Sequence, residues 1–161
     1  MSIEEILNKN ENSKLREALV EYMLLEKLII AAGNKGKRLE ISRSDQDLFG
    51  YDIILKIDSI VKFVQLKSTN KNSKTYYWDI QKAIISDKNS TVILIIISYT
   101  PQEVLIECRV LDESKRTEII NQRPRNRKGN DAFCSIKYGD LIKVENMEEL
   151  LKLLFSKPVE T

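Results

Sequence analysis

The chain has 161 residues, of which 42% are hydrophobic and 31% are charged, with a formal net charge of +2. This balance is that of a globular domain and excludes a disordered or membrane-embedded chain. The longest apolar run, Val92 to Ile97, is far too short to cross a bilayer. The chain contains no histidine, which excludes Ser-His-Asp and Cys-His nucleophiles, His-metal nucleases and Cys/His zinc sites. Any hydrolytic chemistry must therefore rest on carboxylates, lysines and a hard metal ion.

Two features of the chain predict a cytoplasmic protein. Its first residues are acidic and polar, whereas a signal peptide begins with a basic and then an apolar segment. The two cysteines, Cys108 and Cys134, are far apart and lie in apolar surroundings. This placement favours reduced thiols in a core over a disulfide.

A helical turn is expected at 3–7, followed by a long helix over 14–32. Ser13 is a suitable N-cap for this helix, and Gly33 is a suitable end. From Tyr22 onward the helix is apolar almost all round, which is typical of a helix buried against a sheet.

The same helix carries a carboxylate on or beside its core-facing side. Glu17 and Glu21 are one turn apart, and their stripe continues as Leu24 and Leu28. Glu21 is therefore not an obvious solvating charge, and Glu17 takes its place if the helix is shifted. A structural ion pair or a water-exposed helix edge is the equal alternative to a catalytic role for Glu21.

The segment 44–69 predicts two strands folded into a hairpin. A turn about Ser59-Ile60 would place Asp52 opposite Lys67 and Ile54 opposite Gln65. Because side chains alternate along a strand, Asp52, Gln65 and Lys67 would then share one face. The plain alternative is an amphipathic hairpin with a solvated face, which the apolar Ile54 on that face argues against.

The remaining elements are predicted from periodicity and turn signals. A short extended piece is expected at 38–42, a loop at 70–74 and a partly helical segment at 76–86. The β-branched run 91–99 predicts a buried strand, and 104–111 is the next strand. A polar and charged segment at 112–131 precedes short strands at 133–136 and 141–144, then a helix at 147–155 capped by Asn146. We expect a single domain over 1–161, with a core at about 14–111 and a C-terminal extension at 112–161.

The order of elements resembles the PD-(D/E)XK nuclease superfamily, in its QxK variant similar to Mrr-type restriction endonucleases. The shared order is a helix with an inward glutamate, a strand with an aspartate, a strand with Gln-x-Lys, a helix and an apolar strand. The resemblance spans about residues 14–99. It is carried by Asp52 in FGYDIIL, Gln65 and Lys67 in FVQLKS, and Glu21 in ALVEYMLLEK.

The resemblance implies a role for each matched residue. Asp52 would be a magnesium ligand, Gln65 would offer its amide oxygen to the metal or orient a bound water, and the Leu66 carbonyl would complete the ligand set. Lys67 would position or deprotonate the attacking water and offset charge on the scissile phosphate. Glu21 would bind the metal through water or assist the general base.

The chemistry of the matched residues agrees with that implication, with two departures from the usual pattern. Mg²⁺ prefers oxygen ligands, usually one or two carboxylates with waters and phosphate oxygens, and Mn²⁺ is a possible substitute. Tyr51 stands where a proline commonly precedes the aspartate, and Gln65 stands in place of an acid. The second change removes a negative ligand and should weaken metal affinity.

Basic residues cluster locally around the motif, where they could flank a nucleic-acid groove. A solvated loop is the equal alternative for the basic residues near Pro124. The candidates for nucleic-acid binding are Lys35, Lys37, Arg38, Arg43, Lys71, Lys74, Arg123, Arg125, Arg127 and Lys128.

Aromatic residues follow the basic loop after the motif. Tyr76, Tyr77 and Trp78 could stack on bases, although packing in the core is the preferred interpretation. Gln81 is a weaker candidate site residue on the segment after the motif.

These patterns predict an α/β fold, with a restriction endonuclease-like mixed sheet of four to five strands flanked by helices. The 14–32 helix is expected on one side and the 76–86 segment on the other. The predicted function is a Mg²⁺-dependent endonuclease acting on double-stranded DNA, as a homodimer or higher homo-oligomer with no membrane association. The alternative is a catalytically inactive nucleic-acid-binding or protein-interaction module on the same fold.

Overall fold

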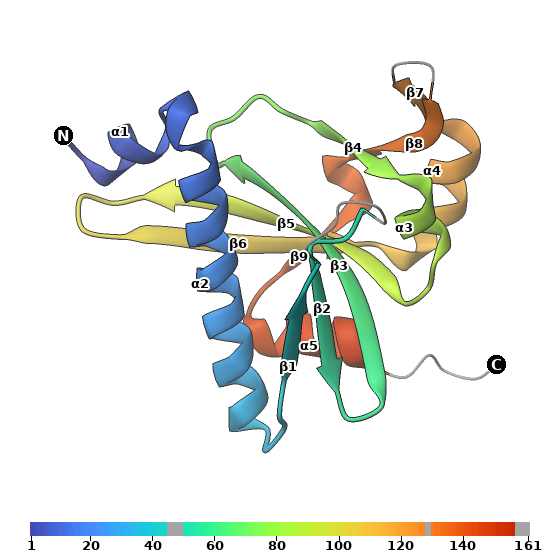
Figure 1. The fold of residues 1–161 in the computed structure, drawn as a ribbon, viewed down its shortest axis with the longest axis horizontal. Coiled ribbons are helices and arrows are strands. Elements are labelled where there is room, and N and C mark those ends of the chain that lie inside the picture. The colour runs from blue at the N-terminus through green and yellow to red at the C-terminus, as the bar shows by residue number, and fades with distance from the viewer. Residues whose placement is uncertain (45–49, 128–129, 157–161) are drawn as a thin grey trace.

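A six-stranded mixed sheet forms the centre of the computed structural model (Figure 1). The structure describes residues 1–44, 50–127 and 130–156, and for 124–127, 130 and 131 the backbone only. The strand order is β1-β2-β3-β5-β6-β9. Strands β3 and β5 are parallel, and each other neighbouring pair is antiparallel. The six strands are β1 (Glu40–Arg43), β2 (Ile53–Ile57), β3 (Ile60–Asn70), β5 (Ser90–Tyr99), β6 (Val104–Leu111) and β9 (Leu141–Val144).

The α/β class is confirmed, but the main sheet is larger than the four to five strands expected. The short extended piece near 38–42 joins the sheet as β1, pairing with β2. At the opposite edge, β9 pairs with β6. These two short strands extend a central sheet whose longer members the sequence predicts well.

Two helices cover one face of the main sheet. They are α2 (Ser13–Asn34) and α5 (Met147–Phe155), preceded at the N-terminus by α1 (Ile3–Leu7) and the 3₁₀ turn η1 (Asn10–Asn12). Leu24 and Leu28 of α2 and Leu150 of α5 are fully buried in the same core cluster as Ile95 of β5. As predicted, Asn146 caps α5, since its side-chain oxygen accepts a hydrogen bond from the Glu149 backbone N–H at 2.9 Å.

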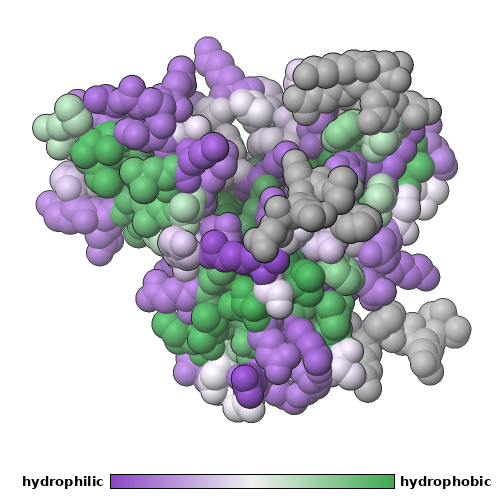
Figure 2. Space-filling view, in the orientation of Figure 1, coloured by the Kyte–Doolittle hydropathy of each residue, from purple (hydrophilic) through white to green (hydrophobic). Residues whose placement is uncertain are grey.

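The predicted ends and burial of α2 need correction. Ser13 is not its N-cap, because η1 runs directly into α2, and Asn12 in the cap position donates its side-chain amide to the Ile6 carbonyl instead. The helix also continues through Gly33, which is not its end. Only one face of α2 is buried, and Tyr22 lies on the opposite face, 56% exposed. Figure 2 shows apolar side chains gathered on this side over the lower part of α2 and the neighbouring strands.

A second, three-stranded sheet covers the other face of the main sheet. It has the order β4-β8-β7 and is accompanied by two short helices. Its inner side joins a separate core cluster that includes Ile80, Ile136 and the β5 residue Leu94. The elements are β4 (Tyr77–Gln81), α3 (Lys82–Ser86), the 3₁₀ turn η2 (Glu113–Lys115), α4 (Arg116–Gln122), β7 (Pro124–Arg127), β8 (Asn130–Lys137) and the 3₁₀ turn η3 (Tyr138–Asp140).

This second layer differs from the sequence-based expectation. The 76–86 segment lies on the expected side and is partly helical as expected, in α3, but it begins with the strand β4, which was not expected. The charged 112–131 segment contains a helix, which is held in place by Ile119, a fully buried residue. Arg116 also anchors it, donating hydrogen bonds to the carbonyls of Ile85 at 2.9 Å and Ser90 at 2.6 Å.

The β2–β3 hairpin forms with a register two residues away from the predicted one. Ile54 lies opposite Phe63, not Gln65, because the turn consists of Asp58 and Ser59 between the paired Ile57 and Ile60. Asp58 adopts a φ of 53°, a left-handed conformation that Asp tolerates better than most residues in a tight hairpin turn. A two-residue shift keeps each side chain on its predicted face, because the side-chain period is two.

Both cysteines are buried and free, as predicted. Burial raises the pKa of the Cys108 thiol to about 12 and that of Cys134 to about 11. The described part of the chain contains no helix with the length and apolar character needed to span a membrane.

Candidate functional site

Asp52 is anchored at the entrance to β2 by the neighbouring strand. Its backbone N–H donates to the Val64 carbonyl at 2.8 Å. Its carboxylate oxygen Oδ2 accepts a hydrogen bond from the Leu66 N–H at 2.6 Å. The carboxylate is thereby fixed against β3 between Gln65 and Lys67, while the residue stays exposed.

Three elements of the fold meet at a small cavity beside Asp52. The cavity has a volume of about 110 Å³ and includes Glu21 from α2 and Lys67 from β3 in its wall. The sequence motif thus comes together in space, although Glu21 and Lys67 are far apart in the chain. The residues that line the cavity are Glu17, Val20, Glu21, Asp52, Leu66, Lys67, Ser68 and Ile95.

Glu21 occupies the more enclosed of the two carboxylate positions on α2. Its side chain is 21% exposed, and its Oε1 lies 3.0 Å from Nη2 of Arg43. That contact is an ion pair without hydrogen-bond alignment, so Oε1 is buried with no hydrogen-bond partner among the described residues. The guanidinium of Arg43 also lies over the ring of Tyr22, 4.9 Å from its centroid. Glu17 lines the same cavity but is exposed.

Gln65 is the one motif residue that does not line this cavity. Its main chain pairs with Val92 of β5, and that of Lys67 pairs with Leu94. Both partners belong to the core cluster on the far side of the sheet from α2, so the side chains of Gln65 and Lys67 share that face of β3. Its side-chain oxygen Oε1 is buried and has no hydrogen-bond partner among the described residues. A buried amide oxygen without a donor is costly, which is why it is a candidate ligand atom.

The donor set suits a hard cation only weakly. Asp52, Glu21 and the amide oxygen of Gln65 are oxygen ligands of the kind that Mg²⁺ accepts. Within the described ranges, however, no group of three or more His, Cys, Asp or Glu side chains is placed to hold a metal ion. Glutamine in place of an acid accounts for this, because it leaves fewer negative ligands.

Gly50 and Gln81 make a close contact at the edge of the site that the sequence did not reveal. Gly50 has a φ of +79°, and a Cβ on it would lie 2.8 Å from Cδ of Gln81. Glycine is therefore required both for the left-handed conformation and for the close approach of β4. The available signal was a glycine two residues before Asp52, which alone indicates only a turn.

Several predicted nucleic-acid-binding residues have acidic partners. Arg43 is paired with Glu21 as described. Lys71 lies 3.6 Å from Glu107. Both pairs are partly exposed and of little energetic consequence, so a phosphate could compete for these cations.

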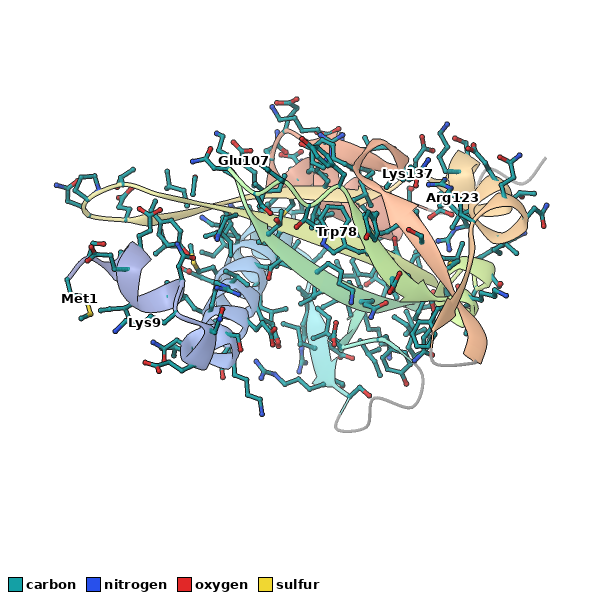
Figure 3. The ribbon with its side chains drawn as sticks, turned by 90° about the horizontal axis from the view of Figure 1, so that it is seen from above. Met1, Lys9, Trp78, Glu107, Arg123 and Lys137 are labelled. Atoms are coloured by element: carbon teal, nitrogen blue, oxygen red, sulfur yellow. The ribbon has the colours of Figure 1, made fainter. Side chains whose placement is uncertain are left out.

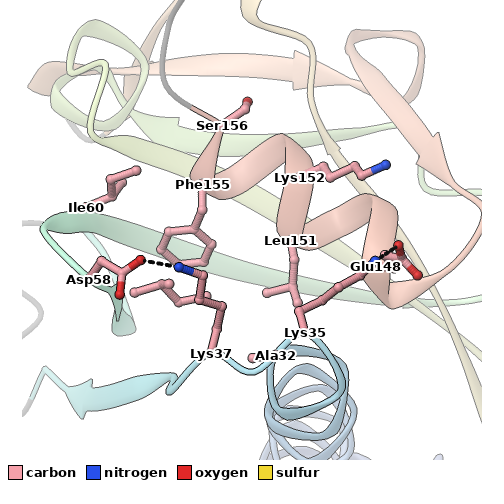
Figure 4. Close-up of a pocket in the computed structure, with 11 residues that line it drawn as sticks. Ala32, Lys35, Lys37, Asp58, Ile60, Glu148, Leu151, Lys152, Phe155 and Ser156 are labelled. Atoms are coloured by element: carbon pink, nitrogen blue, oxygen red, sulfur yellow. Dashed lines mark hydrogen bonds and ion pairs between the residues drawn. The ribbon is translucent and has the colours of Figure 1, made fainter.

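Lys35 and Lys37 lie away from the cavity beside Asp52. They line a separate pocket of about 440 Å³ at the turn end of the β2–β3 hairpin (Figure 4). There Lys37 pairs with Asp58 at 2.8 Å, and Lys35 pairs with Glu148. Residues of α5, such as Phe155, form the apolar wall of this pocket.

Arg123 is committed to a buried ion pair. Its guanidinium contacts both carboxylate oxygens of Asp140, at 2.5 and 2.9 Å, and the two side chains are only 13% and 7% exposed. Burial by itself would raise the pKa of Asp140. The hydrogen bonds from Arg123 and from the Lys137 N–H, with the charge of Arg123, instead hold that pKa below its ordinary value.

The remaining basic candidates are exposed or outside the description. Arg38 and Lys74 are exposed. The side chains of Arg125 and Arg127 are not described, and Lys128 lies outside the described residues.

No protein-family model matches this sequence, and a search of curated proteins found no match.

Proposed function

We propose that the protein is a Mg²⁺-dependent nuclease that hydrolyses phosphodiester bonds, with DNA as its substrate. The observation that carries the proposal is the convergence of Glu21, Asp52 and Lys67 on one cavity from three separate elements. The order of those elements resembles the PD-(D/E)XK superfamily, and this resemblance adds weight without deciding the function. A homodimer is part of the proposal, because hydrolysis of both strands of a duplex needs two such sites.

The residues of the cavity supply the parts that such a reaction needs. Asp52, held by the Leu66 N–H, would bind the metal together with the Leu66 carbonyl, and Gln65 would add its unpartnered amide oxygen. A bound Mg²⁺ would lower the pKa of a coordinated water and stabilise charge on the phosphate.

Lys67 and Glu21 would act on the water and on the phosphate. The ammonium of Lys67 would orient the attacking water and offset the negative charge that develops on the phosphate oxygens. The carboxylate of Glu21 would accept a proton directly or through a second water. Arg43, 3.0 Å from Glu21, would balance its charge until nucleic acid brings phosphates to the site.

A second candidate is a nucleic-acid-binding module without catalysis. It is favoured by the glutamine at position 65 and by the absence of a three-carboxylate group in the described part of the chain. Such a module would keep the cavity beside Asp52 and the basic residues around it while binding metal poorly.

Cleavage of supercoiled plasmid and of circular single-stranded DNA in Mg²⁺ or Mn²⁺ tests the first candidate. The wild-type protein is compared with Asp52→Asn and Lys67→Ala. We expect metal-dependent cleavage that falls at least about 100-fold in each variant, because each removes a group that stabilises the transition state. DNA binding in both variants should persist.

Two matched variants control for nonspecific effects. Asp58→Asn makes the same chemical change at the other end of the same hairpin, at a residue whose φ of 53° suits asparagine. Lys56→Ala removes an exposed lysine of β2 with only a long ion pair to Glu40, 3.7 Å. Both should cleave like the wild type. DNA binding without cleavage in either metal would favour the second candidate, and cleavage that survives in Asp52→Asn would place the site elsewhere.

A further inference from the structure

The outer side of the small sheet contains a groove. Cross-strand pairs place Trp78 beside Ile136 and Tyr77 beside Lys137. Because side chains alternate, Ile80 and Ile136 face the core, whereas Tyr77 and Lys137 face outward. The groove has a volume of about 520 Å³. We call it the tyrosine groove, lined by Tyr76, Tyr77, Arg123, Ser135, Lys137, Tyr138 and Gly139.

The tyrosines of this groove do not pack into the core. Tyr76 is 67% exposed and Tyr77 is 53% exposed. Of the three consecutive aromatic residues, only Trp78 packs against the second core cluster, as Figure 3 shows near the centre of the molecule. The expectation of core packing is therefore wrong for both tyrosines, which are exposed at the surface of the molecule.

Two contacts fix the backbone at Tyr76 and the ring of Tyr138 in the wall of the groove. The Tyr138 N–H donates to the Tyr76 carbonyl at 2.9 Å, which joins the end of β8 to the start of β4. The guanidinium of Arg109 lies 4.1 Å from the centroid of the Tyr138 ring and donates to the Leu141 carbonyl at 2.6 Å. A rigid aromatic surface loses little entropy when it binds a ligand.

The exposed positive charge of the groove comes from one lysine, while Asp79, opposite Ser135 on the same side of β4, is half-buried. The lining of the groove includes Arg123 and Lys137 but no carboxylate. Arg123 is neutralised by the buried Asp140, so Lys137, which is exposed, supplies the positive charge at the surface. Planar exposed rings beside an ammonium group are the combination that binds bases and phosphates of an unpaired strand.

Strand β4 links the groove to the candidate site. It begins at Tyr77 and ends at Gln81, whose side chain contacts Gly50, two residues before Asp52. Four residues of strand span about 13 Å at a rise of roughly 3.3 Å per residue. A strand of nucleic acid with bases on Tyr77 would therefore pass Asp52 within a few nucleotides.

We propose that the tyrosine groove binds single-stranded nucleic acid by stacking unpaired bases on Tyr76 and Tyr77, with Lys137 beside a phosphate. The inference deepens the proposed nuclease function and rests on it for the claim that the bound strand is a substrate. It assigns the groove to an unpaired strand, either single-stranded DNA or one strand of an opened duplex, near the candidate site.

Fluorescence anisotropy of labelled oligonucleotides in EDTA, which prevents cleavage, tests binding alone. The ligands are oligothymidylate, oligouridylate, and an oligomer of abasic deoxyribose phosphate with the same length and charge. We expect Tyr77→Ala and Tyr76→Ala each to weaken binding of the base-containing strands by about fivefold or more, the effect of losing one stack. The conservative Tyr77→Phe should bind like the wild type.

The abasic oligomer separates stacking from charge. It should bind the wild-type protein weakly, and the two alanine variants should not change its affinity. Ile30→Ala, which truncates an apolar side chain on α2 that is 54% exposed, is the control and should bind all three ligands like the wild type. The difference in affinity between the thymidylate and uridylate strands shows which of these two strands the groove prefers.

Three results would overturn the groove assignment: no binding of either base-containing strand, equal binding of the abasic oligomer, or unchanged binding in both alanine variants. The proposed function is tested separately by cleavage. Metal-dependent cleavage with unchanged binding in the tyrosine variants would remove the groove assignment and keep the nuclease. Tyrosine-dependent binding without cleavage would keep the groove assignment and remove the nuclease.

Discussion

Arg123 shows how burial changes the role of a single residue. In the sequence it stands at the start of a basic segment that could follow a phosphate backbone. In the structure two nitrogens of its guanidinium donate hydrogen bonds to the two carboxylate oxygens of Asp140, at 2.5 and 2.9 Å. A charged pair so enclosed depends on both partners, because removing one leaves the other charge uncompensated.

We therefore expect Asp140→Asn to lower the free energy of unfolding by about 3 kcal/mol at pH 7. The folded-state pKa of Asp140 is below its ordinary value, and an unfolded aspartate titrates near about 3.9. The contribution of Asp140 is thus fully present above about pH 4 and is lost as the pH falls through the lower folded pKa. Urea unfolding at a series of pH values measures this.

The difference between Asp140→Asn and the wild type should be constant from neutral pH down to about 4 and then shrink. The double variant Arg123→Met/Asp140→Asn should recover part of the loss, because it removes the uncompensated charge. An unchanged difference down to pH 2 would contradict the assignment of the ionised carboxylate to this pair.

At the scale of elements, the contact between β4 and the segment entering β2 fixes the edge of the candidate site. Gly50 combines a φ of +79° with a hypothetical Cβ only 2.8 Å from Cδ of Gln81. Gly36 offers a matched comparison, since its φ is +67° but a Cβ there would meet nothing within 4 Å.

We expect Gly50→Ala to destabilise the protein by more than Gly36→Ala. The second variant introduces only left-handed strain, which costs roughly 1–2 kcal/mol, whereas the first also displaces Gln81. Gly50→Ala/Gln81→Ala should recover the excess. Equal urea midpoints for the two single variants would mean that the Gly50–Gln81 contact carries no energy.

Some elements could be predicted from the sequence because local signals determine them. The strand 104–111 and the helix 147–155 have the predicted bounds. The apolar pattern of the strand and the capping Asn146 of the helix are both visible in the local sequence. The start of α2 could not be predicted from Ser13, because the preceding 3₁₀ turn uses the side chain of Asn12. The hairpin register depended on a left-handed Asp58, which no pattern in the flanking strands reveals.

For the candidate site, the sequence indicated which residues belong to it but not where each side chain lies. Asp52, Lys67 and Glu21 line one cavity, as the order of elements suggested. Gln65 does not line it, and its burial depends on the pairing of β3 with β5. Such a contact comes from tertiary structure and leaves no local signal.

At the scale of the whole molecule, the main sheet separates two cores. The α2–α5 side contains Leu24 and Ile95, and the opposite side contains Ile80 and Leu94. In the second layer, the sequence predicts the strand at 133–136 but not β4, because β4 forms by pairing with β8 over a long separation in sequence. The cavity beside Asp52 is lined by Val20 and Ile95 of the first core, whereas Lys67 pairs with Leu94 of the second core, so the candidate site lies at an edge shared by both sides. The tyrosine groove belongs to the second layer.

The most direct test of the candidate site is a titration of Mn²⁺ into isotope-labelled protein, followed by NMR. Paramagnetic broadening reports which residues lie near the bound ion, and it needs no knowledge of the substrate. We expect the amide signals of Leu66 and Lys67 to broaden first, followed by that of Glu21, and Asp52→Asn to abolish the effect. Asp58→Asn should leave it unchanged. Broadening that begins instead around Asp58 and Glu148, at the other end of the hairpin, or the same broadening in Asp52→Asn, would contradict the proposed metal site.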